Sequence, residues 1–321
     1  MNAVVVGFGG IGDVHAKAIN KIEKVNLYGI CDIDKERAES GAEEYKTKAF
    51  FNYDDCLKDL NVDYVHICTP HYLHFEMITK ALDAGKRVVV EKPAVMKKEE
   101  LDILYEKYNV KKIFPIIQNR TNKCIKELLK KVSDTSEYGA LKGVKAIVTW
   151  SRGEDYYTQD DWHGRLAKEG GGVLINQALH TLDLMILFGG RAKEVDAFYA
   201  DFSLKNVIEV EDTFSAFIRF ENGAKGIFFA TNAYSKNSAT EVELHFENAT
   251  FSYRDNKLYQ NGELLCADSD EWVGKKYWGN GHEKTLYDLY ENGSKLCLDD
   301  VKDTMDVLFA LYESAENKTK L

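Results

Sequence analysis

Over the first 120 residues, short apolar runs alternate with longer charged and amphipathic stretches. The runs are rich in β-branched residues and predict strands at 2–6, 25–31, 64–68, 87–90 and 112–117. Two of them, 64–68 and 87–90, are almost continuously apolar, which is typical of parallel strands covered by helices on both faces. The alternation with helical segments therefore predicts an α/β domain built on a parallel sheet.

After about residue 120 the pattern changes. It predicts a helix at 123–132, a strand ending at Trp150, a polar loop and an apolar helix at about 172–188. Strands follow at 194–202, 210–220, 226–231, 241–247 and 250–253, with Asn222-Gly223 and Asn261-Gly262 as hairpin turn signals. The 321 residues suffice for two domains. We expect them at 1–120 and 121–321, the second an α+β domain with a large, mostly antiparallel open sheet.

One strand of this second sheet is apolar on both faces. Alternate residues from Phe214 to Phe220 point to one side, whereas Phe217 points to the other. If helices cover one face, the second apolar face needs another cover, and the simplest is a second subunit. We therefore expect a homodimer or homotetramer.

Composition and charge narrow the function classes. Apolar residues make up 45% and charged residues 29% of the chain, as in globular proteins, and the net charge of −10 disfavours nucleic acid or an anionic membrane as a partner. Six cysteines lack CxxC spacing, and His66, His245 and His282 lack ligand spacing, so we expect neither a metal site nor a disulfide framework. Without an 18-residue apolar run or a basic N-terminal segment, we expect a cytoplasmic protein.

The first strand leads directly into a GxGxxG motif made of Gly7, Phe8, Gly9, Gly10, Ile11 and Gly12. In dinucleotide-binding motifs these glycines permit a tight turn, backbone approach to a pyrophosphate, and close packing of helix on sheet. The alternative is an ordinary glycine-rich turn. Asp32, about 20 residues further on, favours the dinucleotide, because an acid there binds the ribose hydroxyls. Its charge would repel the extra phosphate of NADP, although Lys35 and Arg37 soften the repulsion, so we expect NAD.

Two further groups of residues are candidates for chemistry. Lys92 follows the fourth strand and precedes a proline, at the edge where open α/β sheets bind ligands. It is either a cation that polarises a substrate oxygen or one of many surface lysines. In the apolar helix at 172–188, Asn176, His180 and Asp183 fall at positions i, i+4 and i+7. They form either a pocket wall or a set of satisfied buried polar groups.

The loop before that helix concentrates aromatic and hydrogen-bonding side chains: Arg152, Tyr156, Tyr157, Trp162 and His163. Sugar rings stack on such aromatic faces, so the loop is a candidate substrate-binding segment. The alternative is an aromatic loop merely packed between domains. Further candidates are His71, Asn119 and Arg120.

These segments together resemble the Gfo/Idh/MocA oxidoreductases, the family of glucose-fructose oxidoreductase and inositol dehydrogenase. The resemblance rests on 7–12 with His15, Asp32, Thr69-Pro70 with His74, 84–93 with its Glu91-Lys92-Pro93, 170–183, 210–213 and 220–223. It implies a Rossmann domain followed by an α+β domain with a large open sheet. The implied activity is reversible hydride transfer between a nicotinamide and a carbinol or carbonyl of a sugar, polyol or sugar derivative.

The resemblance also implies roles for single residues. Lys92 matches the family's EKP lysine and His180 its active-site histidine, which would accept the hydroxyl proton while Lys92 stabilises the alkoxide. Asn176 departs from the aspartate of many members, since an amide orients a histidine but does not stabilise its charged form. Cofactor contacts are implied for Thr69, Pro70, His74, Glu91, Lys92 and Asn119.

Two other functions of such a chain stay open. One is an NAD-dependent glycosidase that uses transient oxidation to activate elimination. The other is a catalytically silent dinucleotide-binding sensor, against which the presence of Lys92 and His180 argues.

Overall fold

The computed structural model describes residues 1–133, 136–269, 280–294 and 296–317. The chain divides into two compact units, the first made of Met1–Gln118 and Asp270–Asp300 and the second of Asn119–Ser269 and Val301–Leu321. The sequence-based division at residue 120 placed the whole of 121–321 in the second domain. In the structure the chain instead returns to the first unit with helix α10 (Gly281–Tyr290) before it ends in the second.

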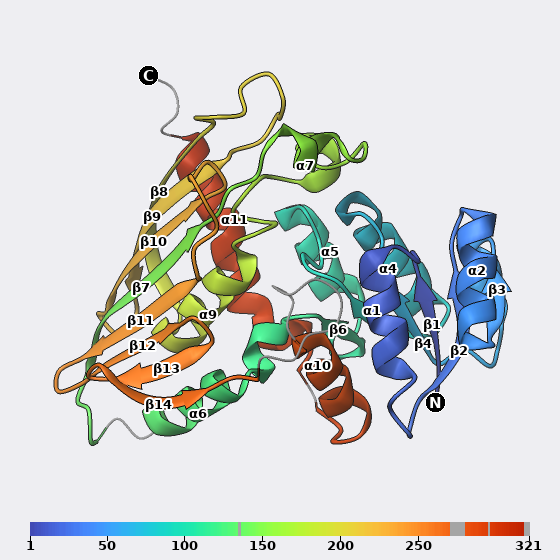
Figure 1. Ribbon diagram of the computed structural model, residues 1–321, viewed down its shortest axis with the longest axis horizontal. Helices are drawn as coiled ribbons and strands as arrows, with labels where there is room; N and C mark the ends of the chain where they lie inside the picture. Colours follow the sequence, from blue (N-terminus) through green and yellow to red (C-terminus); the bar gives the residue numbers. More distant parts are fainter. Residues whose placement is uncertain (134–135, 270–279, 295, 318–321) are drawn as a thin grey trace. The chain divides into compact units, whose positions relative to one another are not determined.

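The first unit contains the predicted parallel sheet, which confirms the Rossmann fold. Its strand order is β3-β2-β1-β4-β5-β6 (Figure 1). The bounds are β1 Asn2–Val6, β2 Asn26–Cys31, β3 Lys48–Phe50, β4 Tyr64–Ile67, β5 Arg87–Val90 and β6 Ile113–Pro115. The central strands β1, β4 and β5 are almost entirely buried, as their apolar sequences predict. Strand β3 was not predicted, because three residues beginning with a lysine give no pattern.

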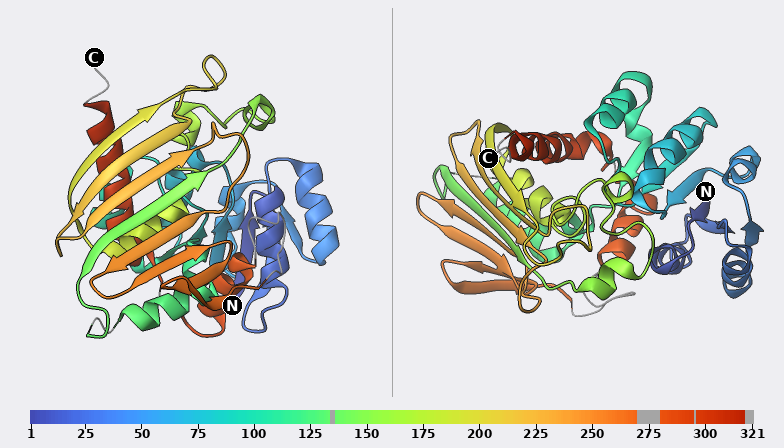
Figure 2. Two further views of the ribbon diagram at one scale, coloured as in Figure 1. Left: turned by 60° about the vertical axis from the view of Figure 1, so that its left-hand side comes forward. Right: turned by 90° about the horizontal axis from the view of Figure 1, so that it is seen from above.

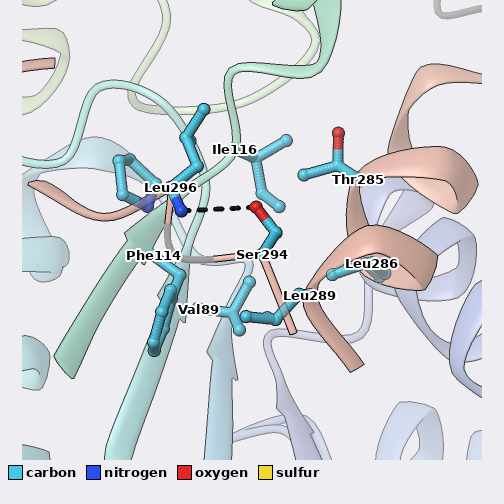
Figure 3. A pocket seen from close by; sticks show the side chains of 9 residues that line it. Val89, Phe114, Ile116, Thr285, Leu286, Leu289, Ser294 and Leu296 are labelled. Carbon is cyan, nitrogen blue, oxygen red and sulfur yellow. Dashed lines mark hydrogen bonds between the residues drawn. The ribbon is translucent and has the colours of Figure 1, made fainter. Parts of the chain in front are cut away.

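The helices of this unit follow the strands. They are α1 Gly10–Ile19, α2 Lys35–Tyr45, α3 Tyr53–Lys58, α4 His74–Asp83, α5 Lys98–Lys107 and α10, with 3₁₀ turns at His71–Leu73 and Val110–Lys112. Asp34 caps α2 and Asn52 caps α3, each accepting a backbone N–H of the first turn. Helix α10 packs against α1. It also helps to line a small, mostly apolar pocket next to β5 and β6, with Val89, Phe114, Leu286 and Leu289 in its wall (Figure 3).

The second unit is built on an eight-stranded sheet with the order β14-β13-β12-β11-β7-β10-β9-β8. The bounds are β7 Leu141–Thr149, β8 Ala192–Ala200, β9 Thr213–Phe220, β10 Lys225–Thr231, β11 Glu241–Phe246, β12 Thr250–Arg254, β13 Lys257–Gln260 and β14 Glu263–Ala267. Strand β10 pairs with β7 in parallel and with β9 antiparallel. Neighbouring strands are otherwise antiparallel, which confirms the predicted α+β sheet. Asn261 and Gly262 have positive φ at the β13–β14 turn, as a hairpin signal predicts.

Helices α6, α9 and α11 pack on this sheet, and the short helices α7 and α8 belong to the loop between β7 and α9. The bounds are α6 Lys123–Val132, α7 Glu154–Thr158, α8 Leu166–Glu169, α9 Leu179–Gly189 and α11 Lys302–Glu316, with a 3₁₀ turn at Leu298–Val301 before α11. Helices α9 and α11 pack on each other and on the sheet (Figure 2). The opposite face carries Phe217, Ile227 and Phe198, which are 67%, 50% and 51% exposed. Phe214 and Phe220, which point the other way, are buried, so the predicted alternation along β9 is confirmed.

The predicted helix at 172–188 is wrong at its start, because α9 begins at Leu179. The buried carboxylate of Glu211 accepts the backbone N–H groups of Gly172 and Leu174, and the Glu211 carbonyl accepts that of Val173. These bonds hold the segment in turns instead of a helix. As for the membrane, none of the helices in the described ranges combines the length and the apolar character that a span requires.

Candidate active site

The glycine-rich turn between β1 and α1 has the shape that a dinucleotide phosphate requires. Gly7 has φ +85°, and a Cβ on Gly12 would lie 2.2 Å from the Gly7 carbonyl oxygen, so both positions demand glycine. A Cβ on Gly9 would meet nothing within 4 Å, which leaves space beside the turn. Gly9 is also the N-cap of α1, and no side chain among the described residues caps this helix. The first N–H groups of α1 are thus available to a phosphate group, and the residues present fit a dinucleotide.

Asp32 lies at the end of β2, next to this turn. Its Oδ2 accepts the backbone N–H of Phe8 at 2.7 Å, and its Oδ1 accepts that of Asp34 at 2.9 Å. The Arg37 guanidinium lies 3.6 Å from the carboxylate. These contacts fix the carboxylate against the glycine turn. The Phe8 ring packs against Gly41 of α2. Phe8 therefore contributes its backbone to the glycine-rich turn and its side chain to the packing against α2.

At the carboxyl ends of β4 and β5, two loops are joined by one histidine. The buried His74 directs Nδ1 to the carbonyl of Pro93 at 2.7 Å and Nε2 to that of Thr69 at 2.8 Å. Burial lowers the pKa of His74, and a neutral ring donates to one of the two carbonyls at a time. The loop that begins with Thr69-Pro70 and the loop that carries Lys92 are therefore held together. Lys92 is partly exposed at this edge of the sheet.

Beneath Lys92 lies a cluster that the sequence analysis missed. The Glu91 carboxylate is buried and receives His15 Nε2 at 2.9 Å and His282 Nε2 at 3.1 Å on the same oxygen. His66 also contacts His15, so His66 and His282, for which the sequence showed no ligand spacing, both belong to this cluster. These residues are far apart in the sequence, and nothing in their spacing indicated the cluster.

In the second unit, His180 lies in the first turn of α9, and Asn176 precedes the helix. The expected i, i+4, i+7 line on one helix is therefore wrong for Asn176. The Asn176 side-chain amide donates to Oε1 of the buried Glu169 at 2.5 Å. Its neighbour Gln177 donates to the Tyr156 hydroxyl at 3.1 Å and accepts from the Asn232 amide at 2.9 Å. The segment before α9 is thus tied to the aromatic loop.

Of the two alternatives for Asp183, a pocket wall or a satisfied buried polar group, its contacts fit the second. Its side chain is fully buried, and Arg120 binds it through Nε at 2.8 Å and Nη2 at 2.6 Å. Thr304 of α11 donates a further hydrogen bond at 2.9 Å. Asp183 is therefore the anion of a buried, bidentate ion pair between α9 and the segment before α6. Asn119 lies in the same 3₁₀ turn as Arg120, Gln118–Thr121, where its carbonyl accepts the N–H of Asn122.

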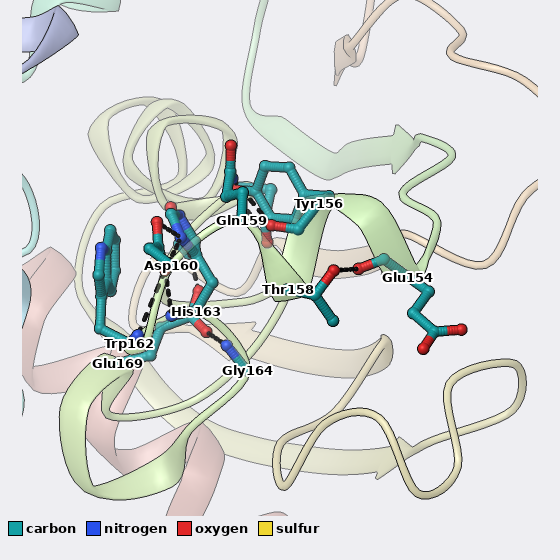
Figure 4. A network of polar contacts seen from close by, with 11 residues as sticks. Glu154, Tyr156, Thr158, Gln159, Asp160, Trp162, His163, Gly164 and Glu169 are labelled. Carbon is teal, nitrogen blue, oxygen red and sulfur yellow. Dashed lines mark hydrogen bonds and ion pairs between the residues drawn. The ribbon is translucent and has the colours of Figure 1, made fainter.

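The aromatic loop forms a cluster of ring contacts in which Tyr156 and His163 are central; Figure 4 shows Tyr156, Trp162 and His163 of this loop. The Tyr156 ring lies edge-on to Tyr157 and to His163, with centroid distances of 4.9 Å each, and the Arg152 guanidinium lies 5.4 Å from its centre. Trp162 packs on His163 at 3.7 Å. Tyr157 is buried, and its hydroxyl accepts the Asn232 amide at 2.9 Å. The four other side chains are partly exposed, so the cluster presents aromatic and cationic surface to solvent.

Two family models match the chain. Residues 1–113 match the oxidoreductase family with an NAD-binding Rossmann fold, and residues 127–252 match the Gfo/Idh/MocA C-terminal domain. The glycine turn, Asp32 and the two-unit fold define the class as a dinucleotide-dependent oxidoreductase. More particularly, the chain belongs to the Gfo/Idh/MocA family, and NAD is its cofactor. The resemblance drawn from the sequence is thus confirmed.

Relatives of known name share the family. Myo-inositol 2-dehydrogenase of Thermotoga maritima is 27% identical over 233 residues, 71% of this chain and 67% of the relative. Levoglucosan dehydrogenase of Pseudarthrobacter phenanthrenivorans is 25% identical over 212 residues, 59% of this chain and 54% of the relative. Among solved structures, the WlbA dehydrogenase of Bordetella pertussis, in complex with NADH and UDP-GlcNAcA, superposes with a TM-score of 0.83 at 25% identity, covering 98% of this chain and 96% of that one.

Proposed function

We propose that the protein transfers a hydride between NAD and a carbinol or carbonyl carbon of a sugar, polyol or sugar derivative. The observation that carries the proposal is the glycine-rich turn between β1 and α1 together with Lys92 at the carboxyl end of β5, in a chain of this oxidoreductase family. The inositol and levoglucosan dehydrogenases among its relatives support the substrate class. The partly exposed aromatic cluster around Tyr156 suits a sugar ring, which has apolar C–H faces and polar edges.

When bound, NAD supplies the hydride acceptor, and the residues of this chain do the rest. The glycine turn and the N-terminus of α1 hold the pyrophosphate, and Asp32 holds the adenosine ribose. The Lys92 ammonium stabilises the negative charge that develops on the substrate oxygen. His180 accepts the hydroxyl proton during oxidation and returns it during reduction. Asn176 orients this histidine, while the substrate contacts come from Arg152, Tyr156, Trp162 and His163. Tyr157, a predicted substrate contact, is buried and instead supports the Tyr156 ring from behind.

The decisive experiment is a screen of polyols and sugars for NADH formation at 340 nm, followed by variants on the best substrate. Lys92→Met should lower kcat by about 10²- to 10³-fold while NADH binding stays within twofold, because one donor to a developing oxyanion is lost. His180→Ala should also slow turnover and remove the dependence of the rate on a group that titrates near neutrality. Near-normal turnover of the Lys92 variant would refute the assignment. Substrate cleavage without net NADH would indicate a glycosidase, and binding of NADH without turnover would indicate a sensor.

We also propose that NAD is preferred over NADP. The Asp32 carboxylate repels a phosphate on the ribose, and Ile33, which follows it, carries no charge. Arg37, 3.6 Å from Asp32, reduces the difference. Fluorescence titration should give a Kd for NADH at least tenfold lower than that for NADPH. Equal or tighter binding of NADPH would show that Arg37 binds the phosphate and that Asp32 does not exclude it.

The partner of the open sheet is, in our proposal, a second copy of this chain. The exposed Phe217, Ile227 and Phe198 on neighbouring strands support it, because large apolar side chains gathered on one exposed sheet face are typical of protein contacts. Light scattering at micromolar concentration should therefore give a dimer or tetramer, and a monomer would refute it. We further expect the protein to act in the cytoplasm, since each of its six cysteines, all within the described ranges, is a free thiol.

A further inference from the structure

A continuous chain of buried polar side chains in the first unit ends at Glu91. The Tyr290 hydroxyl lies 2.6 Å from His66 Nε2, and His66 Nδ1 lies 2.9 Å from His15 Nδ1. His15 Nε2 then reaches Glu91 Oε1 at 2.9 Å, and His282 Nε2 reaches the same oxygen at 3.1 Å. None of the five residues is more than 8% exposed. Such a network is costly unless every member is satisfied, so its composition needs a reason.

The positions of the hydrogen atoms in this network follow from the Glu91 carboxylate at its end. A carboxylate only accepts, so His15 Nε2 carries a proton and donates to Glu91. A neutral His15 then accepts at Nδ1, which requires His66 to donate from its own Nδ1. His66 in turn accepts at Nε2, so the Tyr290 hydroxyl donates to it. One ionised carboxylate thus orients two histidine tautomers and a tyrosine hydroxyl.

The charge states agree with this direction. Burial lowers the pKa of both His15 and His66, which keeps their rings neutral. Burial alone would raise the pKa of the Glu91 carboxyl, but the charge of His282 and the hydrogen bonds of His15 and His282 outweigh it and hold this pKa well below its usual range. Glu91 is therefore an anion in the protein interior, fixed by donors from two helices.

His15, Glu91 and His282 also have the side-chain types of a metal site, with ligand atoms within 4.8 Å of one another. Their nitrogen–oxygen distances of 2.9 and 3.1 Å are those of N–H···O hydrogen bonds. His15 uses its second nitrogen within the chain to His66. Hydrogen bonding thus accounts for the contacts at Glu91 Oε1, and the geometry favours a positioning network.

We propose that Glu91, held in place by His15 and by His282 of α10, is a positioning residue for Lys92. The second carboxylate oxygen, Oε2, accepts the backbone N–H of Lys92 at 3.3 Å, so the anchored carboxylate fixes the backbone that carries the lysine. Helix α10 supplies its donor from 191 residues further along the chain. The proposal rests on the proposed role of Lys92 in hydride transfer, and it gives α10 a part in catalysis that acts through Glu91.

The test removes donors from α10 and measures kcat, the substrate KM and the Kd for NADH. His282→Leu removes the donor to Glu91, whereas His282→Gln keeps an N–H near the position of Nε2. We expect His282→Leu to lower kcat at least tenfold with the NADH Kd within twofold, and His282→Gln to recover most of that loss. Tyr290→Phe deletes the hydroxyl at the far end and should lower kcat severalfold. Tyr287→Phe, which deletes a hydroxyl from the 49% exposed Tyr287 on the same helix, is the matched control and should leave kcat unchanged.

Thermal unfolding of each variant separates positioning from stability. Wild-type kcat in His282→Leu would overturn the proposal. So would equal losses of kcat in the Leu and Gln variants that track their unfolding midpoints, or one equivalent of zinc in the purified protein whose removal by a chelator reproduces the loss. Lys92→Met, measured in parallel, distinguishes the two levels of inference. If it keeps turnover, the proposed function of Lys92 fails; if it is slow while His282→Leu is fast, only the positioning role fails.

Discussion

The buried ion pair between Arg120 and Asp183 gives the sharpest test of how this fold uses polar groups. Asp183→Asn preserves the shape of the side chain but removes its charge, and it turns one acceptor into a donor that faces the Arg120 guanidinium. The Arg120 side chain is only 10% exposed, and Asp183 is fully buried, so the remaining positive charge gains little from solvent. Breaking a buried pair by removing one partner costs about 3 to 5 kcal/mol.

The assay is thermal and urea unfolding followed by circular dichroism. For a unit of this size, 1 kcal/mol shifts Tm by about 2 to 4 °C, so the variant should unfold roughly 6 to 20 °C below the wild-type protein. Thr304→Val, which deletes only the hydroxyl that donates to Asp183, should cost about 1 kcal/mol. The double variant Arg120→Met/Asp183→Leu removes both charges and should recover part of the loss.

Normal stability of the Asp183→Asn variant would contradict a structural role of the ion pair. If Asp183→Asn unfolds within about 1 kcal/mol of the wild-type protein and instead raises the substrate KM, Asp183 belongs to the substrate pocket that the sequence pattern suggested. If kcat and KM of the folded variant stay normal at low temperature while stability falls, the ion pair holds α9 in place and does no more.

Gly12→Ala places a Cβ 2.2 Å from the Gly7 carbonyl oxygen, so this variant should be less stable and should not bind NADH. Gly9→Ala meets no atom within 4 Å, so it should keep the wild-type Tm and weaken only NADH binding. Loss of stability in Gly9→Ala but not in Gly12→Ala would contradict the role of the glycine turn. Burial lowers the pKa values of His15, His66 and His74, so the unfolded chain binds more protons below pH 6.5. The free energy of unfolding is then retained above this pH and falls below it, by about 1.4 kcal/mol per pH unit for each histidine that stays neutral in the folded protein. Urea unfolding midpoints that do not change between pH 7.5 and 5.5 would contradict this prediction. If the proposed oligomer forms through this face, Phe217→Lys should lower the mass measured by light scattering to that of a monomer, and an unchanged oligomer mass would place the interface elsewhere.

The parts of the fold that depend on local rules could be predicted from the sequence. The apolar runs of β1, β4 and β5 and the glycine turn are such parts, because burial and backbone conformation are determined by a few neighbouring residues. The hairpin turn at Asn261-Gly262 is another. Each of these segments satisfies its own hydrogen bonds and packing pattern without reference to distant residues.

The features that the sequence did not predict depend on contacts between residues far apart in the chain. The segment before α9 has a helical apolar pattern, yet Glu211, which lies 39 residues beyond Gly172, captures its N–H groups. Asp183 looked like part of a pocket because the sequence gives no sign of Arg120, 63 residues away, as its partner. The return of α10 to the first unit is of the same kind, since the contact between His282 and Glu91 joins residues 191 positions apart. A single sequence carries no signal for such pairs.

The two buried carboxylates, Asp183 and Glu91, show how a structural anion differs from one that serves a site. Both are desolvated and both are held by donors from distant segments. The partner of Asp183 is a permanently charged guanidinium that is itself buried, so neither charge is accessible to a ligand and the pair contributes to the stability of the fold. The donors of Glu91 are histidines, one of them held neutral by burial, and its second oxygen fixes the backbone of a partly exposed lysine. An anion that leaves the cation beside it accessible keeps that cation's charge for a substrate, so we assign the network around Glu91, and not the ion pair of Asp183, to the proposed hydride transfer.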